Sequence, residues 1–264
     1  TRYIGDWSSD VCSSDLEENV FLWLCTLYSV QTAEEEVASA KLAAVEMLRS
    51  GTTCFLEAGT ILHLDEVFSE LSKVGIRGRL GKWIWDLPPE PVIYRQSTDV
   101  AIENLNRQLE RYNKPSELLS AWSTLVGHTT CSDPLWREAK ALAIKHDVGM
   151  SFHMSPAQID PDGFVAEFGH RPIVHLAEIG VLDDRCALTH MVRVNDAEVD
   201  ILAQSGASVA HCPTTALKVA YGVTQVGKFP EMVQKGVNVS LGTDGNNASN
   251  YSDLMRASYL AAGI

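Results

Sequence analysis

The sequence predicts an α/β protein built on a parallel sheet, and three observations support this prediction. Short runs of apolar and β-branched residues alternate with helical patterns along the chain from Thr32 onward, and seven such runs can be counted. Glycine ends several of the helical patterns. Several runs finish in histidine or aspartate, as expected where the carboxyl ends of parallel strands line one face. Spacing alone leaves a closed barrel and an open doubly wound sheet as alternatives.

The first half begins with a helix that Thr32 caps and that ends at Gly51. Glu35 stands three residues after Thr32 and completes a capping box. Prolines at 88, 89 and 91 indicate an irregular loop. The other elements expected in this half are the strands 52–56, 75–85 and 118–126 and the helices 64–73 and 98–112.

In the second half, Asp133 is expected to cap a helix that has Pro134 at its first position. Asn195 and Glu198 indicate a second capping box. A loop is expected between the strand ending at 153 and the next helix. The other elements expected are the strands 150–153, 186–190, 207–211 and 237–241 and the helices 170–180, 196–204, 227–235 and from 252 onward.

The first 16 residues do not match the rest of the chain, because they are polar, serine-rich and aperiodic. Segment 1–16 resembles a translated sequencing-adapter artefact, with a genuine flexible extension as the alternative, and it is excluded from fold reasoning. Residues 17–264 are assigned to one domain.

Composition narrows the class of protein. The chain has 264 residues, 45% of them hydrophobic, and a formal net charge of −13, which argues against nucleic acid or an anionic membrane as the partner. The six cysteines form no C-x-x-C pair, which favours a reducing, cytoplasmic compartment. No run of about 18 apolar residues is present to span a membrane. A small-molecule substrate is expected, and a homo-oligomer is one possible oligomeric state.

Four strand ends carry the candidate site, namely His153, His190, His211 and Asp244. Imidazole and carboxylate together are the ligand set of catalytic zinc and related divalent sites. An aspartate beside a metal-activated water can also carry its proton. Each residue has a simpler interpretation: a single strand-end histidine is commonly structural, and Asp244 alone could cap the next helix. The joint pattern favours a site.

Other histidines are weaker candidates. His128 follows the strand 118–126 and is an additional candidate, whereas the histidines at 63, 146, 170 and 175 are interpreted as surface or core residues. No G-x-G-x-x-G or G-x-x-x-x-G-K-[ST] phosphate loop and no G-x-S-x-G elbow occurs.

From about residue 31 to 264 the chain resembles the amidohydrolase superfamily, in the branch of atrazine and triazine hydrolases and guanine and cytosine deaminases. The matching motifs are Gly51-Thr52-Thr53, Phe152-His153-Met154, Leu188-Thr189-His190, Val209-Ala210-His211-Cys212-Pro213 and Leu241-Gly242-Thr243-Asp244-Gly245. The resemblance implies a (β/α)8 TIM-type barrel with a flanking β-sandwich, and one divalent metal, zinc first with iron as the alternative. It implies that His153 and Asp244 bind this metal. Asp244 would also shuttle the proton, His190 would contact substrate or the attacking water, and His211 would lie near the substrate pocket.

Two departures from this family matter. The family's H-x-H motif, which comes after the first strand, occurs nowhere in the chain. The chain is therefore expected to be an incomplete barrel, strands 2 to 8, with most of the sandwich missing, and to bind metal poorly and be nearly inactive. Pro156 stands three residues after His153, where the deaminases of this branch usually carry a glutamate. This substitution favours hydrolases of triazine-, urea- or carbamate-like molecules.

The function expected is therefore metal-dependent hydrolysis of a non-peptide carbon–nitrogen bond in an amidine-, urea-, carbamate- or triazine-like small molecule. An aminopurine or pyrimidine deaminase is the alternative. Two rivals from other classes remain, a metal-free phosphate-binding α/β protein and a non-catalytic relative that keeps the barrel as an interaction module.

Overall fold

The sheet is built from parallel strands that succeed one another in chain order. The computed structural model describes residues 26–88, 94–114 and 116–263; segment 1–16 and Pro89 and Pro91 of the predicted loop lie outside them. Two hydrogen-bonded groups, β1-β2-β3 and β4 to β8, are parallel throughout. The strands are β1 (Cys54–Leu56), β2 (Arg77–Leu80), β3 (Leu119–Ala121), β4 (Ser123–Gly127), β5 (Met150–Met154), β6 (Cys186–His190), β7 (Ser208–His211) and β8 (Asn238–Leu241).

Strands β3 and β4 occupy one strand position of the sheet. Only Trp122 separates them, and its N–H donates to the carbonyl of Leu80 in β2. β3 pairs with β2, and β4 pairs with β5, with an irregularity in the register between Thr124 and Gly127. The seven predicted strands are therefore present in order, and the strand predicted over 118–126 is divided in two.

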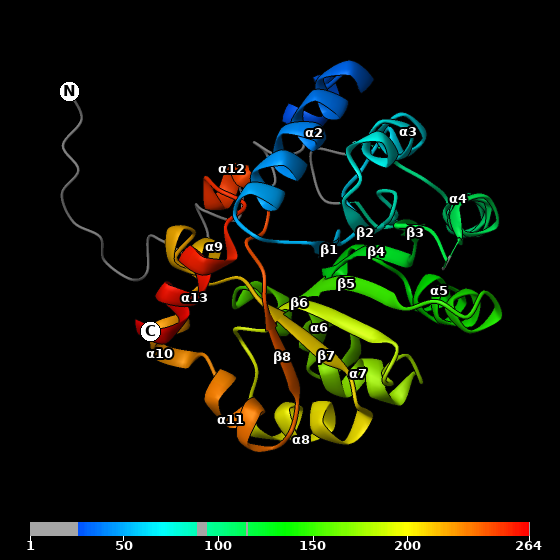
Figure 1. Ribbon diagram of the computed structural model, residues 1–264. Helices are drawn as coiled ribbons and strands as arrows, with labels where there is room; N and C mark the ends of the chain where they lie inside the picture. The colour runs from blue at the N-terminus through cyan, green and yellow to red at the C-terminus, as the bar shows by residue number, and fades with distance from the viewer. Residues whose placement is uncertain (1–25, 89–93, 115, 264) are drawn as a thin grey trace, which may run out of the picture.

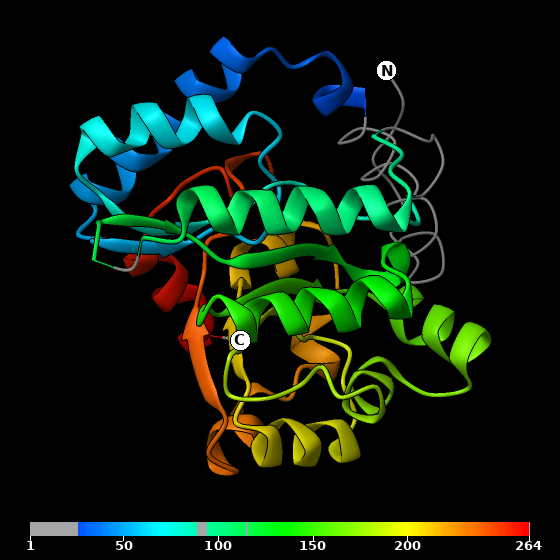
Figure 2. The same ribbon diagram turned by 90° about the vertical axis from the view of Figure 1, so that its right-hand side faces the viewer.

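Helices cover the outer side of the curved sheet (Figure 1). α4 and α5 lie side by side along it (Figure 2). The helices are α2 (Ala33–Arg49), α3 (Leu64–Val74), α4 (Thr98–Tyr112), α5 (Asp133–Lys145), α6 (Ile159–Phe168), α7 (Pro172–Glu178), α8 (Asp196–Ser205), α9 (Pro213–Lys218), α10 (Val223–Val226), α11 (Phe229–Gln234), α12 (Asn246–Ser249) and α13 (Leu254–Gly263). Among the described helices, none is long and apolar enough to cross a membrane.

The helix boundaries test the predictions from sequence. Both capping boxes are confirmed, at the start of α2 and at the start of α8. The predicted cap of α5 is wrong by one residue, because Ser132 accepts the hydrogen bond and Asp133 binds His175 instead. The predicted loop after β5 contains α6, whose sequence includes Pro161 and Gly163. Pro161 falls in the first turn, where no partner for its missing N–H is needed.

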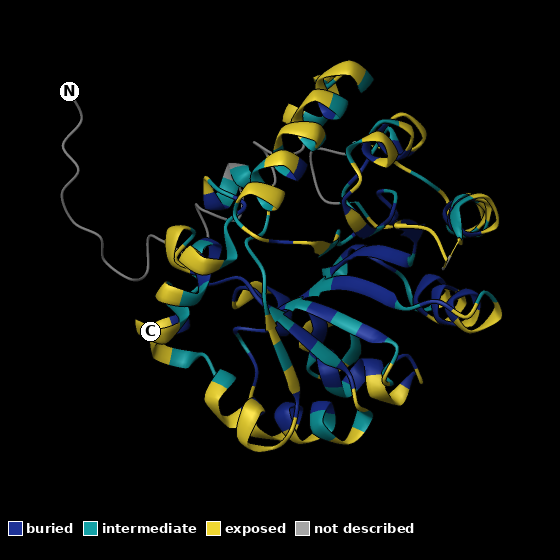
Figure 3. Ribbon diagram, viewed as in Figure 1, coloured by how far each residue is buried: buried dark blue, intermediate teal, exposed yellow. Residues whose placement is uncertain are grey.

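The main core lies between the sheet and its helices. Trp85, Trp136 and Phe152 are among its fully buried side chains. Figure 3 shows buried strands at the centre and exposed residues on the outer faces of the helices. Burial of this kind is the principal source of stability in such a domain.

Within the described part of the chain, the barrel-like sheet is not closed. Among the described residues, β1 and β8 do not pair with each other and form the two edges of the sheet. Two hydrogen bonds join the segment before β1 to the segment after β8. Ser50 Oγ donates to the carbonyl of Ser252 (3.1 Å), and Asn246 Nδ2 donates to Glu46 Oε2 (3.2 Å). Leu56 of β1 is 39% exposed, which is unusual for a strand residue of an α/β barrel.

Candidate active site

Parallel pairing brings the predicted strand ends to one edge of the sheet. Met154 of β5 pairs with His190 of β6, and His211 of β7 pairs with Leu241 of β8. Because all these strands run in the same direction, their carboxyl ends meet at one face, where α/β enzymes place their catalytic groups. His153, His190 and Asp244 therefore lie near one another although they are far apart in sequence.

His190 and Asp244 form the centre of the cluster. His190 Nε2 lies 4.0 Å from Asp244 Oδ2, and the His153 and His190 rings have centroids 5.5 Å apart. The Cys212 thiol joins them: ligand atoms of His190, Cys212 and Asp244 all lie within 4.8 Å of one another. His190 is only 5% exposed, whereas the Asp244 side chain is 23% exposed, so the cluster can be reached from solvent on the side of Asp244.

The orientation of His153 is fixed by the backbone. Its Nδ1 lies 2.7 Å from the carbonyl oxygen of Val126. Because a carbonyl only accepts, Nδ1 carries the proton and Nε2 keeps its lone pair. A metal-ligating histidine commonly donates its other ring N–H to such an acceptor.

His128 joins the cluster through a buried carboxylate that no sequence pattern had indicated. Asp160 Oδ2 accepts from His128 Nδ1 (2.6 Å) and from the Ser155 N–H (2.8 Å). The His128 ring stacks on His153, with centroids 5.7 Å apart. Asp160 lies in the stretch for which the sequence predicts a loop, so no helical or strand pattern singles it out.

His211 is placed differently from the other predicted residues. Its ring stacks on Phe229, with centroids 3.7 Å apart, and it is not in the His190–Cys212–Asp244 group. Tyr221 packs edge-on against His190 at 5.7 Å. Neither aromatic residue was identified from sequence, because both come from the segment between β7 and β8, where no strand-end pattern applies.

Backbone strain is concentrated at these strand ends. His128, Ser155, His190, Met191 and Asp244 all have positive φ angles, between 51° and 81°. Residues other than glycine rarely adopt this conformation, and it persists only where surrounding structure imposes it. Such clustering is typical of functional sites.

Burial also sets the charge state of the cluster. Burial, together with the charge of His128, lowers the pKa of His153 to about 4, and burial lowers the pKa of His190 well below its ordinary value. Burial raises the pKa of Asp244, against the hydrogen bond from the Gly245 N–H. The imidazoles of His153 and His190 are therefore neutral at pH 7, the form in which histidine binds metals.

Comparison with known proteins identifies the family of this chain. The model of the amidohydrolase family matches residues 7–262. The chain is 31% identical over 223 residues to the 5-methylthioadenosine/S-adenosylhomocysteine deaminase of Thermodesulfovibrio yellowstonii, covering 84% of the chain and 49% of that relative. It is 33% identical over 226 residues to the 5'-deoxyadenosine deaminase of Methanopyrus kandleri, again covering 84% and 49%. The chain thus spans about half the length of the curated relatives it matches.

Solved structures with a similar fold include two enzymes with bound zinc. An adenosine deaminase from Xanthomonas campestris with bound zinc superimposes with a TM-score of 0.79 at 27% identity, over 92% of this chain and 54% of the other. A mutant of the atrazine chlorohydrolase TrzN of Arthrobacter aurescens superimposes with a TM-score of 0.81, over 91% of this chain and 56% of the other, and at 17% identity it supports the fold alone. Because the family model matches residues 7–262, nearly the whole chain, this chain belongs to the amidohydrolase family.

Proposed function

We propose that this chain carries the catalytic face of a metal-dependent hydrolase that acts on a non-peptide carbon–nitrogen bond of a small molecule. One observation carries the proposal: His190 and Asp244 approach within 4.0 Å at the carboxyl edge of the sheet, beside His153. The deaminase relatives support the same reaction class.

His153 and Asp244 would hold the metal. The bond from His153 to Val126 leaves Nε2 available, and the Gly245 N–H occupies Asp244 Oδ1 and leaves Oδ2 on the side of His190. His190 Nδ1 is buried without a hydrogen-bond partner among the described residues, so this polar cluster is not self-satisfied. Imidazole and carboxylate donors fit zinc, with iron as the alternative. A bound zinc ion supplies Lewis-acid polarisation that activates water near neutral pH.

The chain's own groups move the proton and steady the charge. Asp244 takes the proton of the attacking water on its carboxylate and delivers it to the leaving nitrogen. His190 donates an N–H to the oxygen on which negative charge develops. His211, stacked on Phe229, flanks the substrate.

Two substrate classes are proposed. The relatives above 30% identity are deaminases of adenosine-type nucleosides, which favours loss of an exocyclic amino group from a purine-like ring. Pro156 favours the second class, triazine-, urea- or carbamate-like molecules, because no glutamate stands at this position to protonate a ring nitrogen. Release of ammonia or of another leaving group from a panel of both classes distinguishes them.

Cobalt(II) binding tests the metal site without requiring turnover. We expect weak binding of one ion per chain, because the family's H-x-H donors do not occur in the sequence. Binding should be at least tenfold weaker still in His153→Ala and Asp244→Asn, since each removes one of the remaining ligands. His170→Ala is the matched control, because His170 lies at the surface beside Glu178. A sulfur charge-transfer band that disappears in Cys212→Ser would add the thiol to the ligand set. Equal affinity in His153→Ala and His170→Ala would contradict the assignment.

The open sheet fits a larger barrel. We propose that the seven strand positions correspond to strands 2 to 8 of a (β/α)8 barrel, with the first strand seated between β8 and β1. Within residues 26–88, 94–114 and 116–263 the outer edges of β1 and β8 have no strand partner, and this and the exposure of Leu56 support the arrangement.

A further inference from the structure

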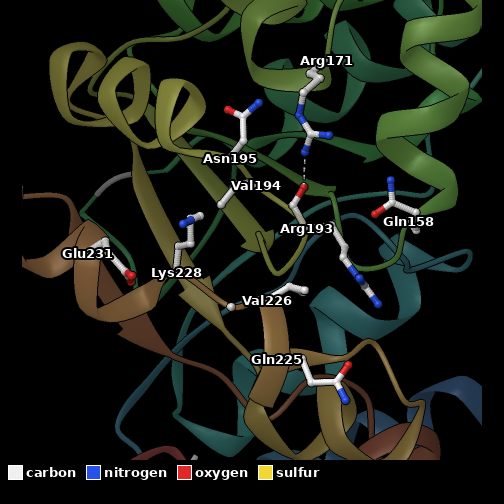
Figure 4. A pocket seen from close by; sticks show the side chains of 10 residues that line it. Gln158, Arg171, Arg193, Val194, Asn195, Gln225, Val226, Lys228 and Glu231 are labelled. Carbon is white, nitrogen blue, oxygen red and sulfur yellow. Dashed lines mark hydrogen bonds between the residues drawn. The ribbon is translucent and has the colours of Figure 1, made fainter. Parts of the chain in front are cut away.

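Figure 4 shows a pocket of about 470 Å³ whose lining contains none of the strand-end cluster residues. It is formed by the loop after β6, the beginnings of α6 and α7, and the segment from α10 to α11. Its polar lining includes Gln158, Arg171, Arg193, Gln225, Lys228 and Glu231. Nothing in the proposed hydrolysis uses this pocket.

The three cations of the pocket differ in how they are paired. Arg171 Nε donates to Glu198 Oε2 (2.7 Å), and Lys228 Nζ lies 2.8 Å from Asp196 Oδ1. Arg193 has no carboxylate within ion-pair distance among the described residues, and its Nε is buried without a hydrogen-bond partner there. An arginine held in this way leaves its charge unpaired and its Nε–H unsatisfied, which costs free energy unless a ligand binds it.

The backbone holds Arg193 in place. Its N–H donates to the carbonyl of Ser155 (2.9 Å), and its own carbonyl accepts from Arg171 Nη2 (2.6 Å). Figure 4 shows the latter bond, with the Arg193 side chain running away from it. A Cβ on Gly222 would lie 2.6 Å from Arg193 Nη2, so a glycine with φ of +79° leaves room for the guanidinium. Tyr221, the preceding residue, packs against His190.

We propose that this pocket binds a small anionic group, a carboxylate or a phosphate, with Arg193 as its principal ligand. A guanidinium presents a planar fork of donors that matches both groups. The chain carries a net charge of −13, so anions are repelled overall and a local unpaired cation is needed to hold one. The amides of Gln158 and Gln225 line the same pocket and add neutral donors. The proposal goes beyond hydrolysis and does not depend on it.

Inorganic phosphate is the first probe. The Nε–H resonance of Arg193 in the 264-residue chain is expected to shift in a saturable manner on titration with phosphate. Arg193→Met should weaken binding about tenfold to hundredfold, as expected for loss of a charged hydrogen-bond donor. Arg193→Lys, which keeps the charge and loses the fork, should fall between. Arg107→Met is the matched control, since Arg107 pairs with Glu103 on the exposed face of α4.

Two results would overturn the proposal: no shift of the Arg193 resonance at any phosphate concentration, or unchanged affinity in both Arg193 variants. A competition arm then identifies the source of the anion. If adenosine monophosphate competes with phosphate and binds with higher affinity than phosphate, the anion is part of a larger ligand that also occupies the strand-end cluster. If adenosine monophosphate has no advantage, the pocket takes a free anion. Failure of the metal-site test leaves the phosphate titration unaffected, so the two proposals fail separately.

Discussion

Replacing Glu198 with alanine tests the buried junction that joins α7 to α8. The Glu198 carboxylate is fully buried and accepts hydrogen bonds from Arg171 Nε (2.7 Å), the Asn195 N–H (3.0 Å) and the Ile173 N–H (3.3 Å). The alanine variant leaves the Arg171 guanidinium without its carboxylate and two backbone donors without an acceptor. It also removes half of the capping box of α8.

The expected loss in free energy of unfolding is about 3 kcal/mol, at the lower end of the range for breaking a buried ion pair, because Arg171 is 27% exposed. Glu198→Gln keeps an acceptor for the backbone donors and should lose less. Glu103→Ala is the control, because the exposed Arg107–Glu103 pair contributes less than about 1 kcal/mol. Urea unfolding followed by circular dichroism measures all three variants. Equal midpoints for Glu198→Ala and Glu103→Ala would refute the reasoning.

Further predictions concern pH, backbone space and the carboxylate beside the cluster. Burial lowers the pKa of His211 from 6.5 to about 4, so the unfolded chain binds this proton more readily. The free energy of unfolding should therefore fall by up to about 3 kcal/mol as the pH is lowered from 6.5 to 4. In His211→Gln, the midpoint of urea unfolding should change less over the same pH range. A Cβ on Gly127 would lie 2.1 Å from the carbonyl oxygen of His153. Gly127→Ala should therefore lower stability by about 3 kcal/mol, against about 1 kcal/mol for Gly236→Ala, where φ is also positive but space is open; equal losses would exclude the steric explanation. Asp160→Ala should cost about 2 kcal/mol by removing the acceptor of its two donors, and unchanged thermal stability would argue against that role.

Local chemistry explains which elements were predictable. Thr32 with Glu35 and Asn195 with Glu198 form capping boxes from residues three apart, so the starts of α2 and α8 need no tertiary information. The helix α6 was missed because Pro161 and Gly163 normally interrupt helices, and packing of Phe164 in the core outweighs their weak propensity. The predicted cap of α5 was wrong because the Asp133 carboxylate forms a hydrogen bond with His175, a residue of another helix.

The candidate site divides in the same way. A period of two within strands and the alternation with helices place His153, His190 and Asp244 at strand ends, and parallel pairing then makes them neighbours. Asp160 and Arg193 carry no such pattern. The role of Asp160 depends on its hydrogen bond with His128, and the role of Arg193 depends on the space that Gly222 leaves for its guanidinium.

The sequence by itself determined the order of strands and helices, the two capping boxes and the strand-end position of the histidines, because each depends on residues a few positions apart. Only the tertiary structure decided that His211 stacks on Phe229 and stays outside the His190–Cys212–Asp244 group, and that Arg193 is left without a carboxylate among the described residues. It also decided that β1 and β8 do not meet within the part of the chain that the structure describes. These properties depend on contacts between distant segments, and distances between such segments are set by packing of the whole chain rather than by local propensity.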